Sequence, residues 1–85
     1  MNERNQLLTR FLLEFLGRLD GGQAVEPVIH AQLNLKMGAP RPTMAEVDAV
    51  LRDCEARRWI VGVRGPLGDP RWSLTPAGEA ALSSL

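Results

Sequence analysis

The first clear pattern is a set of apolar residues that recur at helical spacing near the start of the chain. They predict a helix from about Glu3 to Leu19, which ends at the glycine pair 21–22. Leu7 and Leu13 lie away from the centre of this stripe. Either the helix has a wide core face, or these two leucines are exposed and form a homodimer through the first helix. The central stripe consists of Leu8, Phe11, Leu12, Phe15, Leu16 and Leu19.

A second, shorter pattern follows the glycine pair. Residues 23–25 have the composition of a short edge strand, and Pro27 fits the first turn of a helix, where its missing amide hydrogen costs nothing. A second helix is therefore predicted from about Pro27 to Leu35, with Gly38 as its stop. Two prolines within 37–42 predict a loop between the second helix and the next one.

A capping box marks the start of the third helix. The Thr43 hydroxyl is placed to accept from the backbone amide of Glu46, and the Glu46 carboxylate is placed to reach back. The helix is predicted from Thr43 to about Arg57. Cys54 falls on its buried stripe, so we interpret it as a small core residue and not as a reactive thiol. The predicted stripe is Met44, Val47, Val50, Leu51 and Cys54.

The last third of the chain carries strand and turn signals. Strand-forming residues at 59–64 and an alternating segment at 71–74 flank a turn with two glycines and two prolines at 65–70. Thr75 then caps a final helix that has Pro76 in its first turn. This order of elements predicts one α+β domain, residues 1–85, with three core helices, a hairpin of two or three strands and a C-terminal helix.

Composition narrows the function classes. Ten basic and ten acidic residues cancel in a chain of 85 residues, which argues mildly against tight, non-specific binding to nucleic acid. The one cysteine, Cys54, allows neither an internal disulfide nor a cysteine-based zinc site, and it favours a cytoplasmic location. We expect no signal peptide and no membrane span, because charged residues interrupt the apolar runs.

The residue types do not suggest an enzyme. His30 is the single histidine of the sequence, it stands beside Ile29 in the second predicted helix, and we expect it on the helix surface. The glycines at 62, 65 and 68 are spaced for a turn, and no helix follows them directly, as a nucleotide-binding loop would require. We therefore expect no catalytic residue, no metal and no cofactor.

Two segments resemble the winged helix-turn-helix domains of bacterial transcriptional regulators. Val47–Ile60 has the leucine, polar, arginine and isoleucine ending of a recognition helix, and Trp72–Leu82 matches the leucine-threonine return from a wing, with its glycine. The resemblance implies a winged helix whose third helix enters the major groove of DNA. One departure is Arg58, which stands where this family usually has glycine. Arg58 must adopt a left-handed conformation or end the helix another way.

The resemblance also implies a homodimer that binds double-stranded DNA. Basic residues flank the 37–42 loop, lie within the third helix and stand on the wing. The exposed face of the third helix argues the other way, because Glu46 and Asp48 have the wrong charge to face phosphates. The alternative for each basic residue is a solvated surface charge. The predicted DNA-binding residues are Lys36, Arg41, Thr43, Arg52, Arg64 and Arg71.

A second function is consistent with the same sequence. The neutral charge, the acidic third helix, the long loop and the extra leucines of the first helix are also typical of a winged helix that mediates protein–protein interaction or assembly without DNA. The sequence leaves both functions open. Salt-dependent binding to mixed-sequence duplex DNA would separate them.

Overall fold

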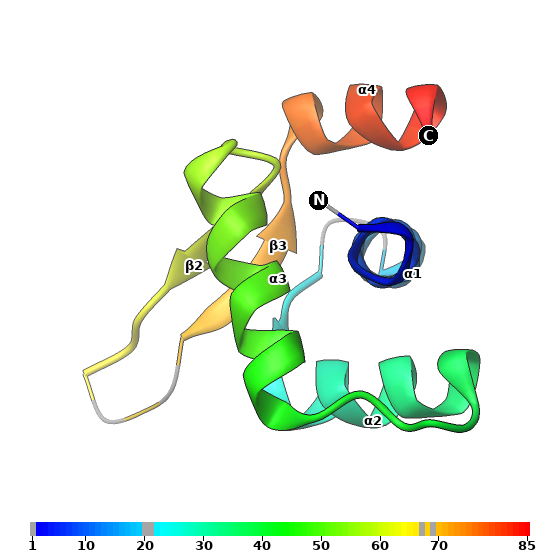
Figure 1. Cartoon of the computed structure of the whole chain (residues 1–85). Coiled ribbons are helices and arrows are strands. Elements are labelled where there is room, and N and C mark those ends of the chain that lie inside the picture. The colour runs from blue at the N-terminus through cyan, green and yellow to red at the C-terminus, as the bar shows by residue number, and fades with distance from the viewer. Residues whose placement is uncertain (1, 20–21, 67, 69) are drawn as a thin grey trace.

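Helices and strands follow one another in the order that the sequence pattern predicts (Figure 1). The computed structural model describes residues 2–19, 22–66, 68 and 70–85, so the predicted glycine pair 21–22 and the predicted turn 65–70 lie partly outside the described residues. Its elements are α1 (Glu3–Arg18), β1 (Ala24–Val25), α2 (Glu26–Met37), α3 (Met44–Ala56), β2 (Ile60–Val63), β3 (Arg71–Leu74) and α4 (Pro76–Ser84).

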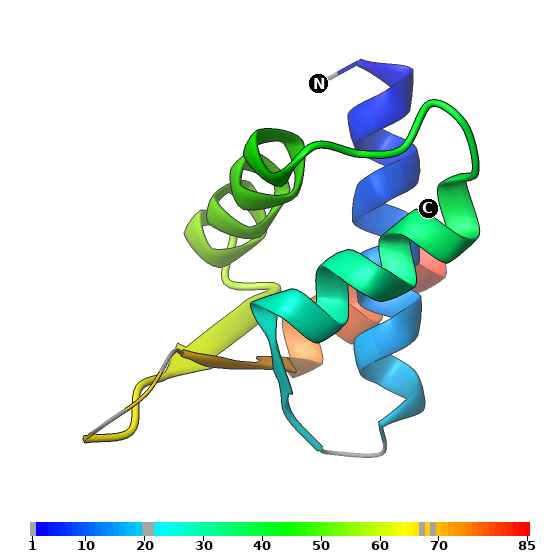
Figure 2. The same ribbon diagram turned by 90° about the horizontal axis from the view of Figure 1, so that it is seen from below.

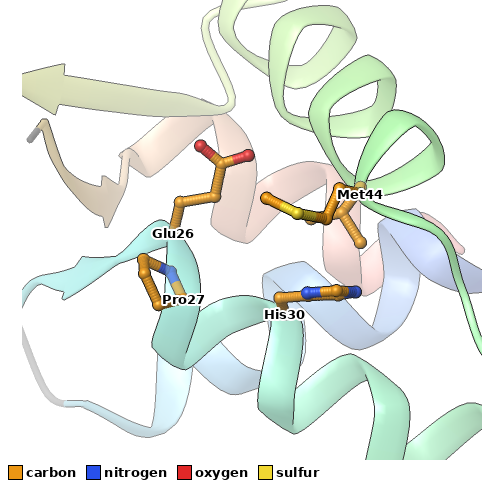
Figure 3. A pocket seen from close by; sticks show the side chains of 5 residues that line it. Glu26, Pro27, His30 and Met44 are labelled. Carbon is orange, nitrogen blue, oxygen red and sulfur yellow. The ribbon is translucent and has the colours of Figure 1, made fainter.

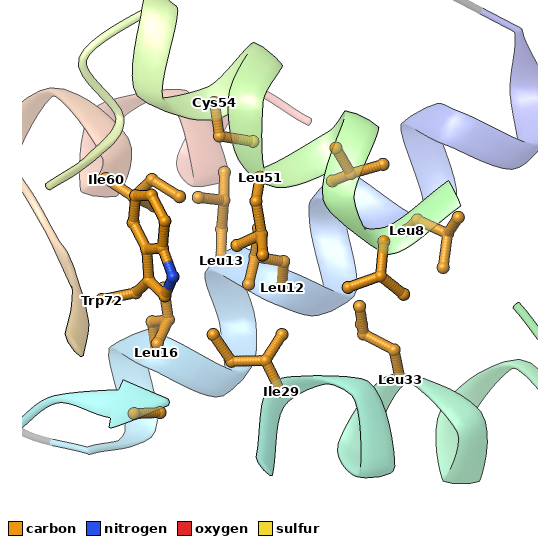
Figure 4. Close-up of a cluster of buried hydrophobic side chains, with 13 residues drawn as sticks. Leu8, Leu12, Leu13, Leu16, Ile29, Leu33, Leu51, Cys54, Ile60 and Trp72 are labelled. Carbon is orange, nitrogen blue, oxygen red and sulfur yellow. The ribbon is translucent and has the colours of Figure 1, made fainter. Parts of the chain in front are cut away.

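The core is built around α1. Figure 1 looks along this helix, with α4 above it, α2 below it and α3 to its left. Because α1 packs against α2, α3, α4 and β3, it needs a wide apolar surface. Its buried leucines meet side chains from the other helices and from the strands in one cluster (Figure 4). The alternative of a wide core face is therefore confirmed by Leu8, Leu12, Leu13 and Leu16.

Leu13 corrects the expectation of an exposed dimer contact. Its side chain is 0% exposed, whereas that of Leu7 is 42% exposed. Leu13 lies within the buried cluster because α1 is packed on several sides and not along a single stripe (Figure 4). The prediction of a dimer contact is wrong for Leu13, and it stays a prediction for Leu7.

The described strands form one three-stranded antiparallel sheet in the order β1-β3-β2. Trp72 of the central strand β3 lies opposite Ala24 on one side and Gly62 on the other. A side chain at residue 62 would place its Cβ 2.9 Å from the Trp72 ring, so the indole fits its buried position because Gly62 has none. Trp72 covers the core, and Trp59 packs at the edge of the same cluster.

α2 is longer than predicted, and α3 has a narrower buried stripe than predicted. Glu26 already starts α2, the chain stays helical to Met37, and Gly38 then ends it with a φ of 67°, which glycine adopts at little cost. Met44 was expected in the buried stripe of α3, but its side chain is 69% exposed. It stands at the first position of the helix, before the turns that pack against α1. The buried positions of α3 are Val47, Val50, Leu51 and Cys54.

Hydrogen bonds from two parts of the chain hold the start of α3. Thr43 and Glu46 form the predicted capping box, in which each backbone amide donates to the other side chain at 3.1 Å. Arg4 of α1 donates to the Glu46 carboxylate and to the backbone carbonyl of Pro40. The hydrogen bonds from Arg4 and from the Thr43 amide hold the pKa of Glu46 below its usual range. This network ties the loop before α3 to α1.

The structure shows how α3 ends at Arg58, where the winged-helix domains it resembles usually have glycine. Arg58 adopts the left-handed conformation, with a φ of 63°. The amide of Trp59 donates to the Cys54 carbonyl at 3.0 Å, and the amide of Arg58 donates to the Glu55 carbonyl at 2.9 Å. These are the two bonds of a Schellman motif, which glycine usually makes possible. An arginine in this conformation costs about 1 kcal/mol, so the surrounding contacts must hold it there.

The same turn is where α4 attaches. The Thr75 amide donates to the Trp59 carbonyl at 3.0 Å, and the Thr75 hydroxyl donates to the Arg58 carbonyl at 2.6 Å while it accepts from the Gly78 amide at 3.0 Å. A Cβ at residue 78 would lie 2.1 Å from the Trp59 carbonyl oxygen. The packing of α4 therefore explains why the segment Leu74–Gly78 has a threonine at position 75 and a glycine at position 78.

We predict that Gly78→Ala destabilises the protein by about 2 kcal/mol, because the new methyl group overlaps a backbone carbonyl and α4 must shift away. Urea denaturation followed by tryptophan fluorescence measures the change. Gly65→Ala is the matched control, since a Cβ there meets nothing within 4 Å, and it should leave the midpoint almost unchanged. Equal stability of Gly78→Ala and the wild type would contradict the described attachment of α4.

Candidate nucleic-acid interface

A groove lies between α3 and the β2–β3 hairpin. The hairpin projects away from the helices (Figure 2). The groove has a volume of about 300 Å³. We call it the α3–hairpin groove. One wall comes from α3, the other from the two strands, and the first residue of α2 closes one side. Its lining residues are Glu26, Asp48, Leu51, Arg52, Glu55, Gly62, Arg64, Pro70 and Trp72.

The α3–hairpin groove is lined by charges of both signs. Its three carboxylates, Glu26, Asp48 and Glu55, outnumber its two guanidinium groups, Arg52 and Arg64. Arg52 donates from Nε to the Asp48 carboxylate at 3.0 Å, one helical turn away. Because both side chains are well exposed, this ion pair contributes only about 0.3–0.5 kcal/mol and can open when a partner arrives.

A second hollow lies between α2 and α3 (Figure 3). We call it the α2–α3 cleft. It has a volume of about 480 Å³ and is lined by Glu26, Pro27, His30, Met44 and Val47. The His30 Nε2 lies 3.1 Å from the Pro42 carbonyl oxygen, so His30 contacts the loop before α3 and also lines the cleft. His30 is partly exposed on the helix surface, as predicted. Glu26 lines both hollows.

The structure brings only some of the predicted DNA-binding residues together. Arg52 and Arg64 line the same groove. Arg71 is exposed, and it points to the opposite face of the sheet from its buried neighbour Trp72. Arg41 is exposed in the loop that joins α2 to α3. Of these four arginines, the structure places only Arg52 and Arg64 in the lining of the α3–hairpin groove.

The other two predicted residues have different positions. The Thr43 hydroxyl is engaged in the capping box, where it accepts from the Glu46 amide. Lys36 lies with Phe11 and Arg18 in a shallow hollow between α1 and α2, away from the α3–hairpin groove. The helical wheel of α2 alone could not show this, because the side of α2 that faces α1 is decided by tertiary packing.

The sequence analysis did not identify Glu26 as a lining residue of either hollow, and it placed Met44 in the core. Glu26 was placed before the second helix, yet it is the residue common to both hollows. An acidic residue in a first helical turn is favoured by the helix dipole, so its residue type alone carries no signal of a site. Met44 was assigned to the core, although its position at the start of α3, next to the cap residue Thr43, was a signal of exposure.

The described residues hold no group of three or more histidine, cysteine, aspartate or glutamate side chains placed to bind a metal ion. No helix of the described residues is long and apolar enough to cross a membrane. Cys54 is fully buried on α3 and faces the core.

Comparison with known proteins identified a solved structure with a similar fold but did not assign the chain to a family. No family model matches the chain, and no curated protein matches it. Among solved structures the chain is similar to one described as "putative transcriptional regulator TA0346 from Thermoplasma acidophilum", with a TM-score of 0.76 and 15% identity over 99% of this chain and 81% of that chain. The two chains share a fold. At this identity the likeness carries the fold alone.

We predict that the Cys54 thiol is inert in the folded protein. Burial raises its pKa to about 11 from an ordinary value of 9.0, with the nearby Asp53 carboxylate adding to the effect. As the pH rises from about 9 to about 11, the thiol ionises in the unfolded chain but not in the folded one, so stability is lost over this range. Urea denaturation at several pH values measures the loss.

Cys54→Ala is the control, because it lacks the thiol and should lose less stability between these pH values, although its stability near pH 7 is lower. A disulfide reagent at pH 8 should label the wild type only as fast as it unfolds. Rapid labelling of the native protein would contradict the buried position of the thiol.

Proposed function

We propose that this chain is a winged-helix transcriptional regulator that binds double-stranded DNA through α3 and the β2–β3 hairpin. The observation that carries the proposal is the pairing of an exposed helix with a projecting hairpin, where Arg52 and Arg64 line one groove between them. A helix in the major groove and a wing on the neighbouring backbone would place these two arginines near phosphates. The likeness to a structure described as a regulator supports the same function by analogy.

Charge limits how tightly this surface can bind DNA. A phosphate about 5 Å from a carboxylate in water is repelled by about 0.8 kcal/mol. The three carboxylates of the α3–hairpin groove therefore offset the attraction from its two arginines. We expect weak binding to arbitrary sequences, with specificity left to base contacts, since Asp and Glu side chains can accept from the cytosine amino group.

The homodimer remains part of this proposal, with Leu7 at its centre. Leu7 lies with Glu3, Gln6, Arg10 and Leu85 around a hollow of about 280 Å³ at the start of α1. Glu3 precedes Leu7 by one helical turn and Arg10 follows it by one, so all three share one face of the helix. An antiparallel pair of α1 helices would place Glu3 of each copy next to Arg10 of the other.

A second candidate is a winged helix that binds a protein partner. The specific observation in its favour is the composition of the exposed surface near the hairpin. Val61 and Val63 are 45% and 51% exposed on β2, and the neighbouring groove has more carboxylates than guanidinium groups. Val61 and Val63 lie on the face of the sheet opposite to Gly62, which lines the groove. A protein partner could cover the apolar strand face or pair with the acidic groove, whereas neither feature suits a phosphate backbone.

We predict opposite effects from two substitutions on DNA binding. Arg64→Ala should weaken binding and lower the salt slope by about 1, because one phosphate contact is lost. Glu26→Gln should strengthen binding about fourfold, because one repulsion of about 0.8 kcal/mol is removed. Fluorescence anisotropy with mixed-sequence duplex DNA at about 50 mM and about 200 mM salt measures both.

Arg18→Ala is the control for the DNA titration, since Arg18 lies in the hollow between α1 and α2, and it should leave binding unchanged. Absence of binding at the lower salt would overturn the DNA-binding function. An equal loss from Arg18→Ala and Arg64→Ala would show that binding depends on net charge and not on the proposed face.

We predict that Leu7→Glu converts a dimer into a monomer, because it places a charge at the centre of an apolar contact. Sedimentation equilibrium measures the association. Arg10→Glu alone should also weaken the dimer, and adding Glu3→Arg should restore it, because the two charges are then exchanged on both copies. A wild-type chain that stays monomeric at high concentration would remove the dimer from the proposal.

A further inference from the structure

The α2–α3 cleft and the α3–hairpin groove are neighbouring hollows along α3, and we call the two together the channel. They share Glu26, and their α3 residues fall on a single helical flank at the spacing i, i+3, i+4, i+7, i+8 and i+11. From the first to the last of these residues α3 rises about 16 Å. An extended peptide of about five residues has the same length. The flank consists of Met44, Val47, Asp48, Leu51, Arg52 and Glu55.

The two ends of this channel differ in chemistry. At the start of α3 the lining is mainly apolar, with Pro27, the buried Val47 and an exposed Met44. A methionine side chain is flexible and polarisable, so it can close over an apolar side chain of varied shape. Towards the hairpin the walls are acidic. Within the described part of the chain, neither Glu26 nor Glu55 makes an ion pair.

We propose that the channel binds an extended segment of a partner protein that carries an apolar side chain followed, about three residues later, by lysine or arginine. The apolar side chain would fill the α2–α3 cleft beneath Met44. The basic side chain would lie between Glu26 and Glu55. Each of these carboxylates is negatively charged and can accept hydrogen bonds, and neither makes an ion pair within the described residues. The α3–hairpin groove has three carboxylates against two guanidinium groups, so its net negative charge complements a basic segment.

The inference goes beyond DNA binding and does not depend on it. A segment in the channel would cover Arg52 and Arg64, the arginines proposed to contact phosphates. The partner and DNA would then exclude each other, and the partner would act as a release signal. A substitution at Glu26 separates the two functions, because the lost carboxylate weakens a basic segment and strengthens a phosphate contact.

The experiment uses the full chain and a fluorescein-labelled pentapeptide, acetyl-leucyl-glycyl-seryl-lysyl-lysine amide, without DNA. Fluorescence anisotropy should show binding that weakens with salt, and amide chemical shifts should change for residues of the α3 flank. A peptide with two glutamates in place of the lysines should not bind. Glu26→Gln should weaken the lysine peptide about threefold, the size of one exposed charge pair.

Met44→Ser tests the apolar end, since it should weaken the leucine peptide and leave a peptide with serine in place of leucine unaffected. Glu79→Gln on α4 is the matched control, because it removes an exposed carboxylate outside the channel. The inference is overturned if the glutamate peptide binds equally well, if Glu26→Gln and Glu79→Gln act alike, or if shifts change only through self-association of the chain. DNA binding that Glu26→Gln strengthens, with no peptide binding, would assign the channel to DNA alone.

Discussion

The burial of α1 on several sides is the constraint on which the rest of the structure depends. A chain of 85 residues has little apolar surface to spare, and here one helix supplies the contact for three others and for the sheet. Because α1 is shared, α2, α3 and β3 cannot move independently. The α2–α3 cleft and the α3–hairpin groove are consequences of this arrangement, since their walls are elements that α1 holds in place.

A second constraint is the turn that follows α3. Arg58 adopts a left-handed conformation there, and the carbonyl groups of Arg58 and Trp59 both accept from Thr75. These bonds join the end of α3, the start of the hairpin and the start of α4 at one point. Gly78 permits the close approach. The angle between α3 and the hairpin, and with it the shape of the groove, is set at this junction.

Some of the carboxylates of α3 are paired with basic groups of the same chain. Glu46 is held by Arg4 and by the capping box, and Asp48 is paired with Arg52. In the lining of the α3–hairpin groove, Glu26 of α2 and Glu55 of α3 make no ion pair within the described residues. Two such carboxylates next to exposed arginines would let the proposed binding surface discriminate between partners of opposite charge.

The sequence by itself determined the order of the elements, because helical periodicity, the Thr43 and Thr75 caps and the glycine and proline signals act over a few residues. At Arg58 it left two alternatives open, a left-handed conformation or another way of ending the helix, and the structure has the first. Tertiary structure alone decided that Leu13 is buried, that Lys36 faces α1 and that Glu26 joins two hollows. Those outcomes depend on which element packs against each side of a helix. The periodic pattern of a helix shows which residues share a face, but it does not show which element covers that face.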